Sequence, residues 1–100
     1  MLIESARSLA DKDAVNRDLN ISSDAIWSEF RFDDGWLLVT AKEGVLGAHH
    51  FVVTDKGEVH FEPGSMPPRW YAQKYSKVSS EPNLELVNDG VRRTPSIEEE

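Results

Sequence analysis

The three histidines are the side chains of this chain best suited to metal binding or acid–base chemistry. His49 and His50 are adjacent, and neighbouring side chains on a strand point to opposite faces, so the pair cannot ligate one metal ion. The strand pairing that we expect places His50 opposite Glu62 and diagonal to His60, which is a two-histidine, one-carboxylate set. Because its spacing matches no known metal motif, we favour ordinary cross-strand pairing and predict no bound metal and no cofactor.

Nucleophilic and phosphate-binding chemistry has little support in the sequence. None of the serines lies in a Gly-x-Ser-x-Gly elbow. Gly44 and Gly47 lack the accompanying lysine and hydroxyl of a phosphate-binding loop. The chain has no cysteine, which excludes disulfides, thiolate zinc sites and a cysteine nucleophile. Asp33 and Asp34 could act as an acid–base pair, but we interpret them as turn formers at a hairpin tip that is open to water. We therefore predict that the protein is not an enzyme.

Hydrophobic spacing indicates the elements that position these residues. Apolar residues at helical spacing predict an amphipathic helix over residues 2–16. Alternation between turn signals predicts four antiparallel strands, at residues 26–32, 36–42, 48–53 and 58–62. Pro68 suits the first position of a short second helix, whose buried side is marked by Trp70, Tyr71, Tyr75 and Val78. This order predicts an α+β fold with an N-terminal helix, a four-stranded antiparallel meander and a short C-terminal helix.

The last part of the chain has little to bury. We expect a single α+β domain over residues 1–78 and an acidic, mobile tail over residues 79–100, with one short strand at Leu84 to Val87. The net charge of −7 divides between them: 12 acidic and nine basic residues give −3 before residue 79, and six acidic and two basic residues give −4 after it. More than half of the excess charge therefore lies in the predicted tail.

Turn geometry determines which side chains share a face of the sheet. If Asp33, Asp34 and Gly35 form the first turn, Phe32 faces Trp36. A glycine-bulge turn at residues 54–57 makes Val53 face Val59 and Phe51 face Phe61. These aromatic and aliphatic residues predict one core face beneath both helices. The half-exposed reverse face is predicted to carry Trp27, Glu29, Arg31, Leu37, Val39, His50, Val52, His60 and Glu62.

Charge and hydropathy restrict the partners. A net charge of −7 argues against binding to nucleic-acid phosphates or to an anionic membrane. No apolar run approaches the roughly 20 residues of a membrane span, and the first residues lack the pattern of a signal peptide. We therefore expect a cytoplasmic protein with neutral or basic partners.

Three stretches carry a family resemblance. They are Gly35-Trp36, the run from Phe51 to Val59, and the run from Trp70 to Tyr75 after a proline-rich loop. Together they resemble the YrhB-type immunity proteins of bacterial polymorphic-toxin systems, over about residues 1–78. The resemblance implies a small cytoplasmic protein that binds a cognate toxin domain and blocks it without chemistry of its own. An acidic inhibitor suits a basic target such as a nuclease.

Because immunity residues vary with the toxin, we choose the candidate partner-binding residues on physical grounds. They are Trp27, Glu29, Asp33, Asp34, His60 and Glu62. Two alternatives to an immunity protein stay open. One is a chaperone-like or general protein-binding module, and the other is a small metal-dependent enzyme that uses His50, His60 and Glu62.

Overall fold

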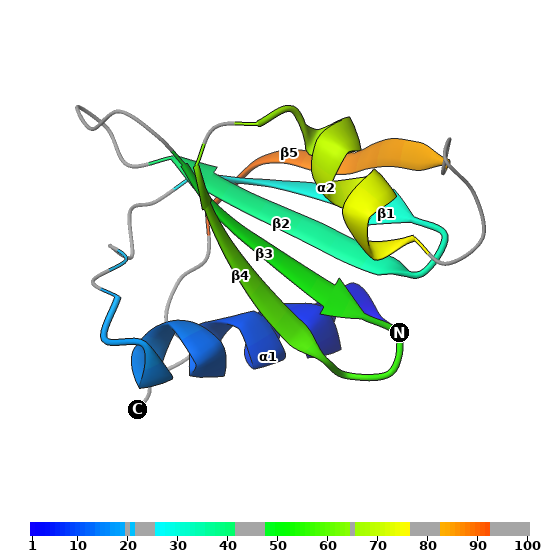
Figure 1. Cartoon of the computed structure of the whole chain (residues 1–100). Coiled ribbons are helices and arrows are strands. Elements are labelled where there is room, and N and C mark those ends of the chain that lie inside the picture. The colour runs from blue at the N-terminus through cyan, green and yellow to red at the C-terminus, as the bar shows by residue number, and fades with distance from the viewer. Residues whose placement is uncertain (20, 22–25, 42–47, 65, 77–82, 93–100) are drawn as a thin grey trace.

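The computed structural model describes residues 1–19, 21, 26–41, 48–64, 66–76 and 83–92, which form an α+β fold. The elements in chain order are α1 (Ile3–Asn16), β1 (Ile26–Phe32), β2 (Gly35–Ala41), β3 (Ala48–Thr54), β4 (Val59–Gly64), α2 (Pro68–Tyr75) and β5 (Leu84–Arg92). The strands form one antiparallel sheet in the order β4-β3-β2-β1-β5. Helices α1 and α2 lie on opposite sides of this sheet (Figure 1). Neither helix in these ranges is long and apolar enough to cross a bilayer.

The sheet has a core on each face because each face is covered by a helix. On the α1 face, the small residues Ala6, Ala10 and Ala14 of the helix are buried and bring it close to the sheet. They pack with Trp27, Trp36, Leu38, Phe51 and Val53. The other core consists of Phe32, Leu37, Val52, Tyr71 and Ala72. The prediction that both helices cover a single face is therefore wrong.

The β1–β2 hairpin closes with a two-residue turn. Phe32 pairs with Gly35 and Arg31 pairs with Trp36, so the predicted pairing of Phe32 with Trp36 is wrong by one residue. Because strand side chains alternate between faces, a shift of one residue moves all of them to the other face. Trp27 consequently joins the α1-side core instead of lying on a half-exposed face.

Gly35 is the first residue of β2 rather than part of the turn. Asp33 and Asp34 both have negative φ, because the only positive-φ non-glycine in the described residues is Asp18. Gly35 is needed for close approach instead. A Cβ atom added there would lie 2.3 Å from the carbonyl oxygen of Val53, a backbone atom that cannot easily move away.

The β3–β4 hairpin agrees with the sequence prediction. Gly57 has φ +90°, and its amide donates a hydrogen bond of 2.9 Å to the carbonyl of Thr54. This is the geometry of a type I turn followed by a glycine bulge. The predicted pairs Val53 with Val59 and Phe51 with Phe61 are confirmed.

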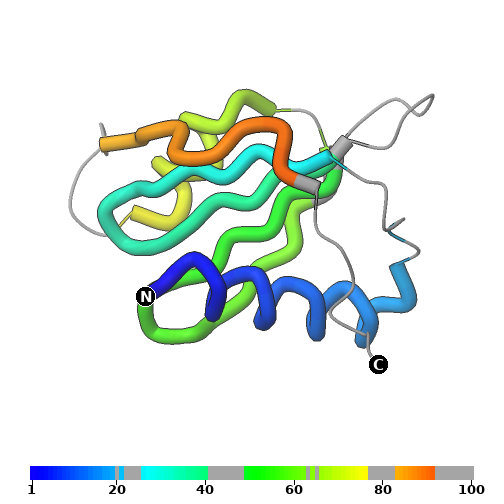
Figure 2. The backbone as a smooth tube through the Cα atoms, turned by 180° about the vertical axis from the view of Figure 1, so that it is seen from behind, coloured from blue at the N-terminus to red at the C-terminus, as the bar shows by residue number. Residues whose placement is uncertain are grey.

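The fifth strand extends the predicted four-stranded meander. Residues 84–92 form β5 and pair with β1 (Figure 2). The sequence predicts that these residues belong to the tail. Leu84 packs against the α2-side core and Val91 against the α1-side core. The short strand expected at Leu84 to Val87 therefore exists and is longer. The other tail residues, 79–82 and 93–100, lie outside the described residues, as does Val78.

Helix α2 is positioned by only part of its predicted apolar side. Tyr71 and Ala72 are buried, whereas Trp70 is 39% exposed. The helix begins at Pro68, as predicted. Proline suits this position because the first amide of a helix has no partner within the helix.

Candidate functional site

Two of the six candidate partner-binding residues lie in the interior. Trp27 is 4% exposed, and its ring centroid lies 5.9 Å from that of Phe51. The carboxylate of Glu29 is fully buried and accepts two hydrogen bonds from Arg7, at 2.6 and 2.7 Å. Its Oε1 atom also accepts a 2.9 Å bond from the side-chain amide of Asn88. The hydrogen bond to Glu29, opposed by partial burial, raises the pKa of Arg7. These two candidates join α1, β1 and β5 instead of facing a partner.

Two further candidates, His60 and Glu62, attach α2 to β4. The ring of His60 stacks on Tyr75, with centroids 4.6 Å apart. Glu62 accepts hydrogen bonds from the hydroxyl of Tyr75 and from the Nζ atom of Lys74, the latter at 2.7 Å. Burial raises the pKa of Glu62, but the bonds from Lys74 and Tyr75 oppose it, so this pKa lies below its ordinary value. Burial and the same hydrogen bond raise the pKa of Tyr75.

His50 supports α2 in a similar way. It pairs with Glu62 across the strands, as predicted, and it is 3% exposed. Its ring stacks on Tyr71 with centroids 4.2 Å apart. Tyr71 and Tyr75 are one helical turn apart on α2, so two stacked histidine–tyrosine pairs hold the helix on the sheet. Within the described ranges, no three His, Cys, Asp or Glu side chains are arranged to hold a metal ion.

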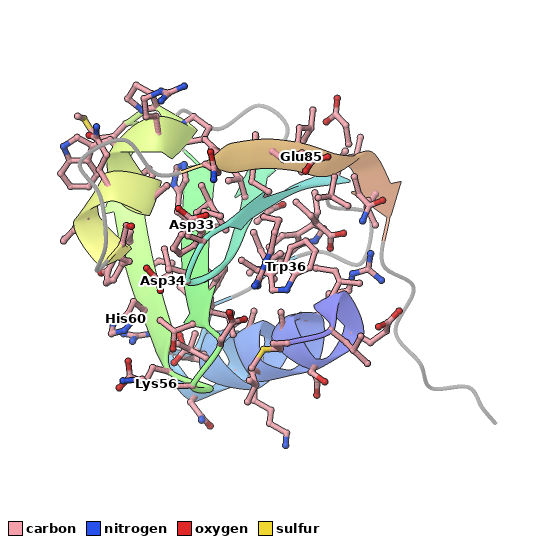
Figure 3. The ribbon with its side chains drawn as sticks, turned by 90° about the vertical axis from the view of Figure 1, so that its right-hand side faces the viewer. Asp33, Asp34, Trp36, Lys56, His60 and Glu85 are labelled. Atoms are coloured by element: carbon pink, nitrogen blue, oxygen red, sulfur yellow. The ribbon has the colours of Figure 1, made fainter. Side chains whose placement is uncertain are left out.

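The remaining candidates, Asp33 and Asp34, lie at one end of the sheet. Asp33 is exposed, and its carboxylate accepts hydrogen bonds of 3.3 Å from the backbone and side-chain amides of Asn83. The carbonyl of Asp34 accepts a 2.9 Å bond from the amide of Asp55, which joins the β1–β2 turn to the β3–β4 turn. The exposed Glu85, near the start of β5, lies on the same side of the molecule (Figure 3). We call Asp33, Asp34 and Glu85 the acidic end.

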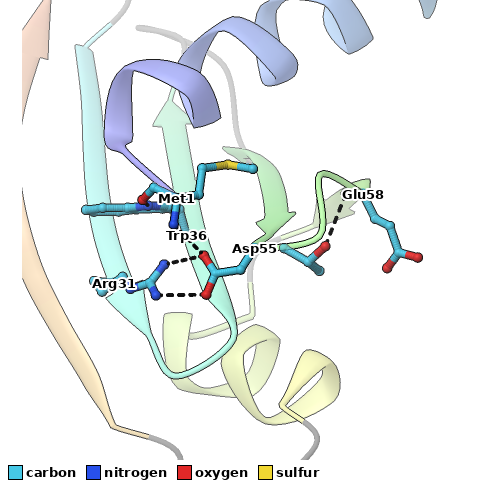
Figure 4. Close-up of polar contacts among 6 residues, drawn as sticks. Met1, Arg31, Trp36, Asp55 and Glu58 are labelled. Carbon is cyan, nitrogen blue, oxygen red and sulfur yellow. Dashed lines mark hydrogen bonds and ion pairs between the residues drawn. The ribbon is translucent and has the colours of Figure 1, made fainter.

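Arg31 and Asp55 form an ion pair beside the acidic end (Figure 4). The guanidinium donates to both carboxylate oxygens, at 2.8 and 2.9 Å, and lies 5.5 Å from the ring centroid of Trp36. The indole N–H of Trp36 donates to the carbonyl of Met1, whose amino group lies 3.1 Å from the Asp55 carboxylate. The bond to Arg31, opposed by burial, lowers the pKa of Asp55. These two cations outnumber the single carboxylate of Asp55, and Arg31 is also attracted by Asp33 and Asp34, so they offset part of the negative charge of the acidic end.

No family model, curated protein or solved structure matches this chain. Function must therefore be inferred from the surface that the fold presents. Sequence reasoning missed Glu85 as a candidate because it lies in the predicted tail. The short strand expected at Leu84 to Val87 already contained Glu85, but no residue pattern showed that this strand pairs with β1.

Proposed function

We propose that this chain is an immunity protein that binds a cognate bacterial toxin domain and neutralises it by occlusion, without catalysis. The observation that carries the proposal is the acidic end, where Asp33 and Asp34 occupy a turn hydrogen-bonded to its neighbour and Glu85 pairs with Arg31, two residues before Asp33. Grouped carboxylates of this kind attract a basic partner and raise the rate of encounter. The proposed partner is thus a basic toxin domain, such as a nuclease, met in the cytoplasm.

The covered sheet restricts where that partner can bind. Helix α1 packs on one face and α2 on part of the other, so the sheet has no face free of helix, in contrast to the half-exposed reverse face that the sequence predicts. His50, His60 and Glu62 hold α2, which supports a structural role for them over a metal-dependent one. We therefore propose that the partner contacts the acidic end and the β5 edge of the sheet.

The proposal is tested with the toxin domain encoded beside this gene. Purified protein is expected to form a stable complex with that domain and to abolish its activity when the two are mixed in equal amounts. A neighbouring toxin domain that stays active and unbound would contradict the proposal. Weak binding to many unfolded proteins would indicate the chaperone-like alternative.

The role of the acidic end is tested by Asp33→Asn combined with Asp34→Asn. Asparagine keeps the preference for turns and removes both charges. We expect association with the toxin domain to slow by about tenfold at low salt and to become less salt-dependent. Asp11→Asn combined with Asp18→Asn changes the net charge equally at two exposed positions on or just after α1. Equal slowing in this control would assign the effect to net charge alone.

A further inference from the structure

The outer side of β5 combines exposed apolar side chains with negative charge. Leu86 is 48% exposed and Val87 is 44% exposed. Glu85 and Asp89, on either side of them in the strand, are also exposed. Large apolar residues at the surface are common singly, but two in succession with charged neighbours resemble the centre and rim of a protein interface.

The strand is irregular at this position. Phe30 of β1 pairs with Leu86, and Glu29 pairs with Asn88, so Val87 is an extra residue with no partner in the pairing. A second shift follows, because Trp27 pairs with Val91. Bulges reorient side chains and are frequent at functional sites. The first bulge therefore falls at the apolar pair, where Leu86 lies opposite Phe30 and Val87 is the inserted residue.

Hydrogen bonds fix the carboxylates near this apolar pair. Asp89 accepts a 2.8 Å bond from the hydroxyl of Ser28, and Asp33 accepts bonds from Asn83, the residue before β5. Their orientation is therefore set before a partner arrives, which reduces the entropy lost on binding.

Two occupants can be compared on charge and geometry. A second copy, added to this edge as an antiparallel strand centred on Val87, would place Glu85 and Asp89 of the two copies opposite each other, and like charges directly opposite are destabilising. Bulges also make an edge strand a poor template for strand addition. A partner with an apolar side chain between lysine or arginine residues would match both the centre and the rim.

We propose that Leu86 and Val87 are the apolar centre of a binding surface whose acidic rim, Asp33, Glu85 and Asp89, selects a basic partner. The inference deepens the proposed immunity function and rests on it for the identity of the natural partner. The partner contacts side chains of β5 and does not extend the sheet.

The experiment uses the full chain and a synthetic probe. Backbone amide NMR shifts are followed while the peptide acetyl-Arg-Lys-Leu-Arg-Lys-amide is added up to about 1 mM, where even an interaction of about −4 kcal/mol is detected. We expect the largest shifts at residues 84–90. A peptide with Ser in place of Leu should bind more weakly, and one with Glu in place of each basic residue should not bind.

A matched pair of variants locates the site. Leu86→Ser combined with Val87→Ser should weaken binding of the basic peptide by about tenfold, as expected for central contact residues. Leu2→Ser combined with Val15→Ser removes two apolar residues that are 72% and 76% exposed on the α1 side, and it should leave binding unchanged. Shifts outside β5, no shifts, or equal effects of the two variants would overturn the inference.

The inference and the immunity function can fail separately. If the neighbouring toxin domain is neutralised equally well by the Leu86→Ser, Val87→Ser variant, the function stands and the β5 surface is wrong. If the peptide binds at β5 but that toxin domain does not, the surface stands and the immunity function is wrong.

Discussion

Glu29 shows how a single buried charge determines what a residue can do. A carboxylate without solvent is tolerated only when it is paired and hydrogen-bonded, and here Arg7 and Asn88 provide those bonds. The sequence could not predict this pair, because Arg7 is 22 residues away and is one of 11 basic residues. It could predict only that residue 29 lies on the same face of its strand as Trp27.

The Arg7–Glu29 pair should contribute far more to stability than an exposed pair on the same helix. Arg7→Met leaves the buried carboxylate without its cation and should lower the free energy of unfolding by about 3 kcal/mol. Arg17→Met removes the exposed bond to Asp13 and a cation–π contact with Phe61, and it should cost about 1 kcal/mol or less. Urea unfolding of both variants measures the difference. Equal losses of stability in the two variants would show that the buried carboxylate of Glu29 does not need the charge of Arg7.

Asp55 should make the protein sensitive to acid. Its pKa in the folded state is lowered, chiefly by the bond to Arg31, below the ordinary value of 3.8. The stabilisation is therefore complete above the unfolded-state pKa and is lost as the pH falls through the folded-state pKa. The Asp55→Asn variant should have a lower free energy of unfolding than the native chain at pH 7, and this difference should become smaller at about pH 3. A gap that stays constant between these pH values would contradict the assignment.

The length of the first turn determines which side chains of β1 and β2 share a face of the sheet. Both hairpins were predictable from glycine and aspartate positions, and α1, α2 and the first four strands fall close to their predicted ranges. The register of the first hairpin was not, because a turn of two residues and one of three are both compatible with Asp33-Asp34-Gly35. The difference of one residue brought Trp27 and Glu29 into the core.

Gly35 and Gly57 should respond differently to alanine. Gly35→Ala forces a Cβ atom against the backbone of β3 and should destabilise the fold by about 3 kcal/mol. Gly57→Ala meets no atom within 4 Å, and it should cost about 1 kcal/mol because its φ is +90°. Thermal unfolding monitored by circular dichroism ranks the two variants. A larger loss of stability at Gly57 would contradict the close approach of Gly35 to the backbone of β3.

At the scale of the whole molecule, β5 makes the C-terminal segment part of the domain. The sequence predicts a mobile tail with one short strand at Leu84 to Val87, because Leu84, Leu86 and Val87 form the only local apolar cluster. An edge strand needs few apolar residues, because it has a neighbouring strand on one edge only and the helices cover its two faces only in part. Composition alone therefore could not show that this strand joins the sheet or that it extends to Arg92.

Truncation tests the place of β5. A chain that ends at Val78 loses one of the two strands that pair with β1 and the Asn88 bond to Glu29. We expect it to unfold at lower urea concentration, with a loss of about 3 kcal/mol or more in the free energy of unfolding. A chain that ends at Arg92 keeps every described element and serves as the control. Equal stability of the two chains would show that the sheet does not need its fifth strand.

The pairing of β1 with β5 also sets the order in which the molecule can be completed during synthesis. Glu29 and Asn88 are 59 residues apart, and ribosomes add about 5–20 residues per second. Helix α1 and strands β1–β4 therefore emerge while β1 still has an unpaired edge. The sheet can close, and a neutralising surface that includes β5 can exist, only after residue 92 has left the ribosome.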